Sequence, residues 1–457
     1  MTAPTSRARG AHRAPDDDAL PPVPASTGPT GPYRGSPREI WNRFWFTPVP
    51  LRRLGLFRLA FTLYALVDLV GPSRYMLRYS TDDPTFFHPI QIIKRFHLGP
   101  WGHGPTELIL YVGIAALVLA VLGVGTQFAC AVSAACYTWW FATFYSYGAV
   151  QHGKITVSIA LWLCAITPSG ATYSIDSLIR RSWRARPPGP LPDADDRRDA
   201  VAGWALRVMM VLVVCAYNFG CYSKLRRQGL GWATGHALQR LIVEKHTWLG
   251  MKVAFHPHLL EVLQILTLIL EGSALVVFRR GRVRDFYFFN SSLFHIGTLF
   301  LLDINFSGLM LAYIAFYDLE KGADRVSGAL KRRAPGLLRP LELVYDGTCK
   351  LCVRTIAPLR ALDWFGLVTW KDGSGAGPMT EMTATDARGT QGGYDAFRRL
   401  AAALPLLWPA VILMRLPGVR PLGTRVYRYV AEHRGTNGSC GVDTCSLSAL
   451  PPPARAG

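Results

Sequence analysis

Long apolar stretches occupy the middle of the chain, where charged residues are confined to short clusters. Eight stretches approach the length of about 20 apolar residues that a helix needs to cross the hydrocarbon core of a bilayer. They lie at about 54–71, 107–124, 127–147, 154–170, 202–222, 258–278, 286–303 and 306–319. Only a short turn at Asp303–Phe306 separates the last two. The pattern predicts an all-α polytopic membrane bundle with about eight spans.

Both ends of the chain lack this pattern. Residues 1–39 are rich in Pro, Ala, Arg and Ser and predict a disordered tail. This segment has no apolar core followed by a cleavage site, so we expect the first span, not a signal peptide, to direct insertion. We assign 40–320 to the transmembrane domain, 321–340 to a basic linker, 341–435 to a small α/β domain and 436–457 to a Cys-containing tail.

Basic residues set the expected orientation. The net charge of +20 suggests a polyanion such as nucleic acid, but Lys and Arg gather in the loops between the apolar runs. Such loops are where the positive-inside rule places them, so the lipid bilayer is the expected partner and nucleic acid is not. With the first segment inside, the inner loops hold far more Lys and Arg than the outer loops. We therefore expect a multi-pass protein of the cell membrane with both termini and the C-terminal domain in the cytoplasm.

Ionisable residues inside spans are costly and suggest function. For Arg58, Asp68 and Arg207 we favour structural pairing or snorkelling to the interface. By the topology above, His152, Lys224 and His295 all fall toward the outer face. A Lys held in a dry pocket can act as a neutral general base, which a solvated Lys cannot do near neutral pH.

The segment around Lys224 carries a family resemblance. Tyr-Asn-Phe-Gly-Cys-Tyr-Ser-Lys-Leu at 217–225, followed by Trp-Ala-Thr-Gly at 232–235, resembles the signature of the HTTM family. That membrane domain is shared with vitamin K-dependent gamma-glutamyl carboxylases. Leu-Phe-Arg-Leu-Ala at 56–60, the run from Gln151 to Pro168, and Phe294 with His295 fit the same pattern, so the resemblance covers about 40–320.

This resemblance implies a reaction and a cofactor. The matching Lys of the family deprotonates a reduced naphthoquinone, whose oxygenation gives an epoxide and a base strong enough to take a proton from a glutamate side chain before carbon dioxide adds. By that resemblance Lys224 is the base, and His152 and His295 contact the quinol or its oxygenated form. The family's large lumenal domain, which docks the substrate's propeptide, has no counterpart among the outer loops.

The C-terminal segment has a different signature. Leu341–Tyr345 predicts a short buried strand, Asp-Gly-Thr-Cys-Lys-Leu-Cys follows at 346–352, a helix runs to about Leu362, and 366–371 predicts a second strand. A strand, Cys-x-x-Cys, helix and strand begin a thioredoxin-like fold, in which the helix N-terminus stabilises a thiolate.

The same residues resemble the DCC family of thiol-disulfide oxidoreductases, and the helix expected at 425–434 matches the end of that family. The resemblance implies that Cys349 is the attacking thiolate and Cys352 the resolving thiol, with Asp346 positioning or deprotonating one of them. The expected partner is a thiol or disulfide of a protein or a small molecule. A structural zinc site remains an alternative, because Cys440 and Cys445 can complete a set of four thiolates with Cys349 and Cys352.

Two hypotheses follow for the whole chain. The first is a membrane-bound oxidoreductase with a quinol-handling membrane domain and a thiol-disulfide exchange domain. The second is a non-catalytic membrane scaffold or adaptor that carries a thiol-redox or zinc-binding domain, because a fold does not by itself imply an activity.

Overall fold

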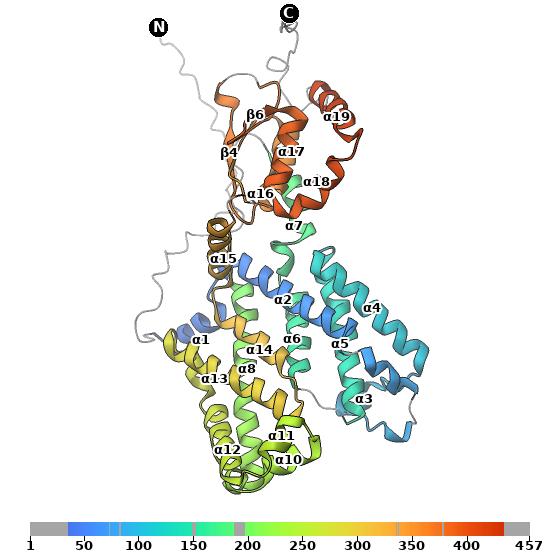
Figure 1. Cartoon of the computed structure of the whole chain (residues 1–457), viewed down its shortest axis with the longest axis vertical. Helices are drawn as coiled ribbons and strands as arrows, with labels where there is room; N and C mark the ends of the chain where they lie inside the picture. Colours follow the sequence, from blue (N-terminus) through green and yellow to red (C-terminus); the bar gives the residue numbers. More distant parts are fainter. Residues whose placement is uncertain are drawn as a thin grey trace, which may run out of the picture. The chain divides into compact units, whose positions relative to one another are not determined.

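Figure 1 shows the chain as a computed structural model, which describes residues 35–72, 74–81, 84–148, 152–186, 197–334, 336, 338–376 and 379–433. The chain divides into two compact units, and the boundary lies after Phe44. Helix α1 (Pro37–Phe46) begins in the first unit, where Glu39 Oε2 accepts a hydrogen bond from the Ser36 amide at 2.8 Å. The helix therefore starts inside the segment 1–39 that we expected to be a disordered tail. Residues 1–34 lie outside the described residues.

Each of the eight apolar stretches is helical. The first seven form α2 (Leu51–Val70), α4 (His103–Leu122), α5 (Thr126–Ser146), α6 (His152–Ile166), α8 (Ala200–Gln228), α12 (Pro257–Gly272) and α13 (Arg282–Leu302). The eighth forms α14 (Ser307–Leu311) and the 3-10 helix η6 (Ala312–Phe316). Helix α6 ends at Ile166, because Pro168 cannot continue it.

The number of helices that can cross a membrane is smaller than eight by length and composition. Within the described residues, α4 and α8 are long and apolar enough, and there are up to four spans if each of two bent helix pairs counts as one. One pair is α2 with η1 (Arg74–Thr81), and the other lies in the C-terminal region. The count of about eight spans therefore stays a prediction.

Short elements connect the long helices. They are β1 (Val49–Pro50), η2 (Pro84–Phe86), α3 (Gln91–Phe96), η3 (Ser169–Ala171), α7 (Ile175–Arg184), β2 (Arg198–Asp199), α9 (Gly231–Thr234), α10 (Ala237–Lys245), α11 (Trp248–Val253) and η5 (Ala274–Phe278). Strands β1 and β2 pair antiparallel.

The helices of this region pack closely around an apolar core. Helix α5 lies between α4 and α6, and α2 packs against α4 and α6 (Figure 1). Gly113 of α4 faces α5, and a Cβ at this position would lie 3.1 Å from the Cβ of Cys136. A glycine here lets the two helices approach, as small residues do in membrane helix packing. Phe57, Phe61 and Leu117 fill the core.

Charged groups within this core have partners. Arg58 is completely buried and donates hydrogen bonds to the carbonyl oxygens of Ala120, at 2.6 Å, and Tyr173. The Lys154 amine lies 2.8 and 2.9 Å from the two carboxylate oxygens of Asp68, which also accepts a hydrogen bond from the Tyr137 hydroxyl at 2.8 Å. Arg58 and Asp68 thus make the structural pairings that we expected.

The segment 321–340, which we expected to be a linker, is largely helical. Helix α15 (Leu319–Arg333) is held against the start of α2 by ion pairs. Arg53 donates to both carboxylate oxygens of Glu320, at 2.9 and 2.6 Å, and Arg52 donates to Asp324 at 2.8 Å. Glu320 and Asp324 lie close in sequence to the basic residues of this segment. Their ion pairs with Arg53 and Arg52 hold the helix against α2.

The C-terminal region contains a small mixed sheet. Its strands are β3 (Leu341–Tyr345), β4 (Val368–Asp372), β5 (Thr383–Asp386) and β6 (Gly389–Gly392), in the order β4-β3-β5-β6. Strand β3 is parallel to β4 and antiparallel to β5, and β6 pairs antiparallel with β5. Helix α16 (Lys350–Ala361) makes the crossover that a parallel pair requires.

Five more helical elements complete this region. They are η7 (Ser374–Ala376), α17 (Gly393–Ala403), η8 (Pro405–Leu407) with α18 (Trp408–Met414), and α19 (Val419–His433). Leu341, Leu343 and Tyr345 alternate inward and are buried. The predicted first strand and following helix are confirmed, and the second strand begins at Val368, two residues later than expected.

The Lys154 and Asp68 pair gives a test of the buried-charge arrangement. Lys154→Met leaves the Asp68 carboxylate without its cation in a dry core, and we expect a loss of about 3–5 kcal/mol in the free energy of unfolding. Combining Lys154→Met with Asp68→Asn removes both charges and should recover part of that loss. Thermal unfolding of the purified protein measures both effects, and a double variant less stable than Lys154→Met alone would contradict the expectation.

Candidate functional sites

The Cys-x-x-Cys motif lies where β3 passes into α16. Cys349 is the residue that precedes the first turn of α16, and Cys352 lies in that turn. The sequence folds this way because a buried strand ends at Tyr345 and a four-residue turn separates it from the helix. Cys349 is completely buried, whereas Cys352 is half-buried. The thiol expected to attack is therefore the less accessible of the two.

Asp346 organises the turn. Its Oδ1 accepts hydrogen bonds from the Thr348 amide at 2.9 Å, the Thr348 hydroxyl at 2.6 Å and the Cys349 amide at 3.2 Å. Such a side-chain-to-backbone turn fixes the chain just before a helix. The carboxylate thus contacts the backbone of Cys349, which supports a positioning role for Asp346.

A second carboxylate supports the same turn from the neighbouring strand. Asp372 is in register with Tyr345 at the ends of the parallel strands β4 and β3, and its Oδ1 accepts from the Gly347 amide at 3.0 Å. A Cβ on Gly347 would lie 2.0 Å from Asp372 Oδ2, so any other residue there would displace the Asp372 carboxylate. Burial raises the pKa of Asp372, but hydrogen bonds from Ser374 and Gly347 outweigh it and hold the pKa below its usual value.

Sequence reasoning did not identify Asp372. The available signal was weak: an Asp that ends the second strand of a parallel pair lies at the same sheet edge as the motif that ends the first.

The zinc alternative depends on residues beyond the described part of the chain. Cys440 and Cys445 lie outside the described residues. Within the described ranges, no three or more His, Cys, Asp or Glu side chains gather as metal ligands would. The structure therefore leaves the alternative of a four-thiolate site untested.

In the helical region Lys224 is paired with a carboxylate. Its amine lies 2.6 and 2.7 Å from the two carboxylate oxygens of Glu271 on α12, and 5.3 Å from the ring centroid of Trp232. Gly220 lies one turn earlier on the same face of α8, and a Cβ there would come within 3.2 Å of Glu271. The glycine leaves room for the carboxylate. The Lys224 side chain remains 25% exposed, so this pair is reachable from outside the bundle.

His295 belongs to a neighbouring polar group. Its Nε2 lies 2.6 Å from the Tyr217 hydroxyl, which also contacts Ser291 at 2.5 Å and the Tyr313 hydroxyl. His295 is buried, and its Nδ1 has no hydrogen-bond partner among the described residues. This group joins α8, α13 and η6 through side chains that can pass a proton between them.

The described residues do not place Lys224 and His295 in one hydrogen-bonded group, and for His152 the expected convergence stays a prediction. Lys224 and Tyr217 lie two turns apart on α8, roughly 10 Å along the helix axis, and each has its own partner from another helix. His152 begins α6, and its side chain is not among those described. The structure thus places two adjacent polar groups along one helix.

Gly347 provides a test of the motif's support. Gly347→Ala forces a methyl group into the Asp372 carboxylate and breaks the hydrogen bond between them, so we expect the C-terminal region to lose about 1–3 kcal/mol of stability. Gly375→Ala is a matched control, because a Cβ there meets nothing within 4 Å. Denaturant unfolding measures both variants, and equal stability would contradict a close fit at Gly347.

A known family model matches each of the two regions, the helical region and the C-terminal region. Residues 46–319 match the HTTM domain, and residues 343–438 match the DCC1-like thiol-disulfide oxidoreductase domain. No curated protein and no solved structure matches the chain. The two matches confirm the fusion that the sequence motifs indicated. Because the first match covers more than half of the chain, this protein belongs to the HTTM family, and it carries a DCC1-like thiol-disulfide oxidoreductase domain after its membrane region.

Proposed function

We propose that this protein is a membrane-bound oxidoreductase whose C-terminal domain exchanges thiols and disulfides through Cys349 and Cys352. The observation that carries the proposal is the turn at the start of α16, where Asp346 holds the Cys349 amide and both cysteines lie at the helix N-terminus. Unpaired amides at such an end stabilise a thiolate. The sheet order β4-β3-β5-β6, with one parallel pair and a terminal hairpin, supports a thioredoxin-like fold for the domain.

The exchange proceeds in two balanced steps. The Cys349 thiolate attacks one sulfur of a partner disulfide, forming a mixed disulfide and releasing the other partner sulfur as a thiolate. Cys352 then loses its proton and attacks Cys349 Sγ, which releases the second partner thiol. The cysteine pair ends oxidised and the partner ends reduced. Because Cys349 is buried, the turn must open before the first step.

For the membrane region we propose quinol chemistry at Lys224, with Glu271 as its proton acceptor. A close ion pair in a dry setting can become neutral by moving one proton from the ammonium to the carboxylate. The amine that results can take the proton of a quinol hydroxyl. The contact between Lys224 and both oxygens of Glu271 supports this proposal, because it places an acceptor for the ammonium proton within hydrogen-bond distance.

His295 has a secondary place in this proposal. Its Nδ1, which has no hydrogen-bond partner among the described residues, and the hydroxyl of Tyr217 belong to a polar group beside the Lys224 pair along α8. Such a group suits contact with the oxygen atoms of a reduced naphthoquinone. We propose the same role for His152 on the basis of the family resemblance alone.

The two activities are separate in this proposal. If the chain crosses the cell membrane eight times with both termini in the cytoplasm, Lys224 lies near the outer face. The thiol domain then lies on the inner side. Direct contact between the cysteines and the quinol is then not expected.

The thiol proposal is tested with cysteine and aspartate variants. Cys349→Ser and Cys352→Ser should each reduce insulin-disulfide reduction to background, while Cys136→Ser in α5 should retain the activity. Asp346→Asn keeps an acceptor oxygen and should stay active. Asp346→Ala should lose about 1 kcal/mol of stability together with activity.

A trapping reaction separates the two thiols. With an aromatic disulfide reagent, Cys352→Ser should accumulate a mixed disulfide on Cys349. Accumulation only in Cys349→Ser would reverse the assigned roles. Loss of activity in a fully folded Asp346→Asn protein would contradict positioning and indicate proton transfer by Asp346.

The quinol proposal is tested by epoxide formation from a reduced naphthoquinone and oxygen. Lys224→Ala removes the base, and we expect a loss of about 100-fold or more, with a comparable loss in Glu271→Gln. Lys252→Ala is the matched control, because the Lys252 amine also lies over an indole ring, 3.9 Å from the Trp248 centroid. No epoxide from the unaltered protein would reject this activity. No activity in either assay would favour a scaffold or adaptor.

A further inference from the structure

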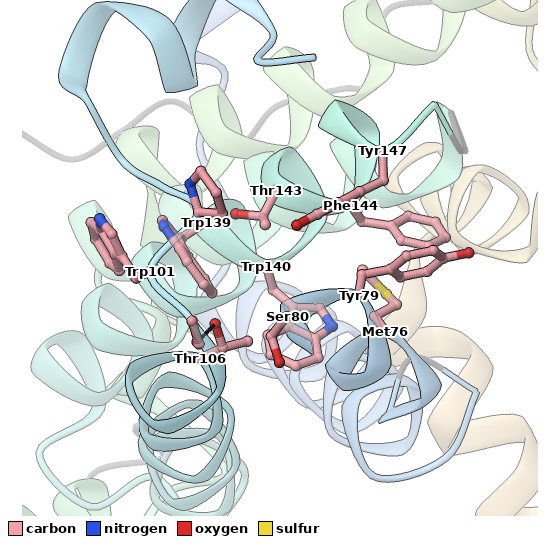
Figure 2. A pocket seen from close by; sticks show the side chains of 12 residues that line it. Met76, Tyr79, Ser80, Trp101, Thr106, Trp139, Trp140, Thr143, Phe144 and Tyr147 are labelled. Carbon is pink, nitrogen blue, oxygen red and sulfur yellow. Dashed lines mark hydrogen bonds between the residues drawn. The ribbon is translucent and has the colours of Figure 1, made fainter. Parts of the chain in front are cut away.

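Cavities in the helical region and in the C-terminal domain differ in size and charge. A pocket between η1, the start of α4 and the end of α5 is lined by uncharged side chains, many of them aromatic (Figure 2). Its volume is about 20 Å³, which is room for about one water-sized group. A cavity in the C-terminal domain has a volume of about 410 Å³ and therefore offers far more room for a ligand.

Arginines line the larger cavity. They are Arg339, Arg388, Arg399 and Arg415, and Asp386 is the one acidic residue that lines it with them. Arg399 donates a hydrogen bond to the Asp386 carboxylate at 2.8 Å, so these two charges compensate each other. The other three arginines make no ion pair with any residue that the structure describes. The cavity therefore has uncompensated positive charge, which favours an anionic ligand.

Helix α18 forms one side of this cavity and also carries exposed apolar side chains. Ile412, which lines the cavity, and Leu413 are 67% and 62% exposed, and Leu416 just beyond the helix is 52% exposed. Trp408 at the start of α18 also lines the cavity, and its indole N–H donates to the Ala402 carbonyl at 3.0 Å. Tryptophan is typical of the boundary between lipid and water. Apolar side chains beside basic ones are typical of a helix that lies on a membrane surface.

The geometry of these helices suits the surface of a membrane better than its interior. Helix α17 followed by η8 and α18 is apolar enough for a span, but its two parts are bent by 110°. Ala396 and Leu400 of α17 are buried in the core that the sheet also forms. Helix α17 therefore belongs to the folded domain, and the exposed apolar side chains of α18 are the ones that can contact lipid.

We propose that the C-terminal domain docks through α18 on a membrane surface that contains anionic lipid. In the docked state Arg339, Arg388 and Arg415 bind the phosphate of a lipid headgroup in the cavity. Ile412 and Leu413 contact the apolar part of the lipid. Arginine suits this role, because its planar guanidinium can donate two hydrogen bonds to the oxygens of one phosphate. The docking surface contains neither the cysteines nor the lysine pair of the membrane region, so it goes beyond the proposed activities.

Charge and attachment both favour lipid over a second copy of this chain as the partner. The segment 396–431 contains no Asp or Glu. In a symmetric dimer formed through this face, arginines would therefore oppose arginines. Only residues 334–340 separate α15, which packs on α2, from the first strand of the domain. The domain thus stays within reach of the bilayer, and a modest affinity for lipid suffices because docking is an intramolecular step.

Hydrogen–deuterium exchange of the full-length protein in lipid nanodiscs tests the proposal. In discs of phosphatidylglycerol and phosphatidylcholine in equal parts, the amides of 408–416 should exchange about tenfold more slowly than in phosphatidylcholine alone. Amides of α16 should exchange equally in both. Arg388→Ala with Arg415→Ala should remove most of this protection, because each arginine at an anionic surface changes binding about fivefold. Arg332→Ala with Arg354→Ala is the matched control and should keep the protection, since these two exposed arginines lie outside the cavity.

Two further measurements separate docking on lipid from other causes of protection. Ile412→Ser with Leu413→Ser keeps every arginine and should still weaken the protection in anionic discs, because docking also uses apolar contact. All four substituted side chains at 388, 412, 413 and 415 are exposed, so these variants should fold as the unaltered protein does. If inorganic phosphate protects 408–416 in phosphatidylcholine discs as well as anionic lipid does, the cavity binds a soluble anion and docking is rejected. Equal exchange in the two kinds of disc, or protection that survives loss of Arg388 and Arg415, also overturns the proposal.

Discussion

Charge buried among apolar helices must be neutralised, and this constraint arranges the polar residues of the membrane region. Arg58 meets two backbone carbonyls, Lys154 meets Asp68, and Lys224 meets Glu271. The two lysine pairs differ in access. Lys154 and Asp68 have side-chain exposures of 10% and 9%, whereas the Lys224 side chain is 25% exposed. The enclosed Lys154 and Asp68 pair fits a structural role, and the Lys224 and Glu271 pair is the one for which we propose quinol chemistry.

The C-terminal domain uses carboxylates in another way. Asp346, which follows β3, and Asp372, which ends β4, accept hydrogen bonds from backbone amides of the turn that leads to α16. Two acceptors from two parallel strands fix a short segment that has no regular structure of its own. The reactive motif thus depends on the sheet, since the position of Asp372 follows from the register of β4 with β3.

Local patterns in the sequence predicted the features that depend on neighbouring residues. The apolar runs form helices, the alternating residues 341–345 form a buried strand, and the Cys-x-x-Cys motif lies at the start of a helix. Pairings between residues far apart in the sequence could not be predicted from it. Glu271 is 47 residues from Lys224, and no periodicity connects them. The basic character of 321–340 suggested a linker, because the acidic residues that bind Arg52 and Arg53 gave no local signal. Burial of Cys349 depends on packing around the turn, which a spacing motif does not encode.

The unequal burial of the two cysteines affects how the domain reacts with oxidants. A peroxide reaches the half-buried Cys352 more readily than the enclosed Cys349. Sulfenic acid formed on Cys352 has a second thiol one helical turn away, and condensation between them gives a disulfide that reductants can reverse. Further oxidation to sulfinic acid, which is largely irreversible, must compete with that nearby condensation. For the thiol-disulfide exchange that we propose, this condensation would protect the two sulfur atoms that the reaction uses.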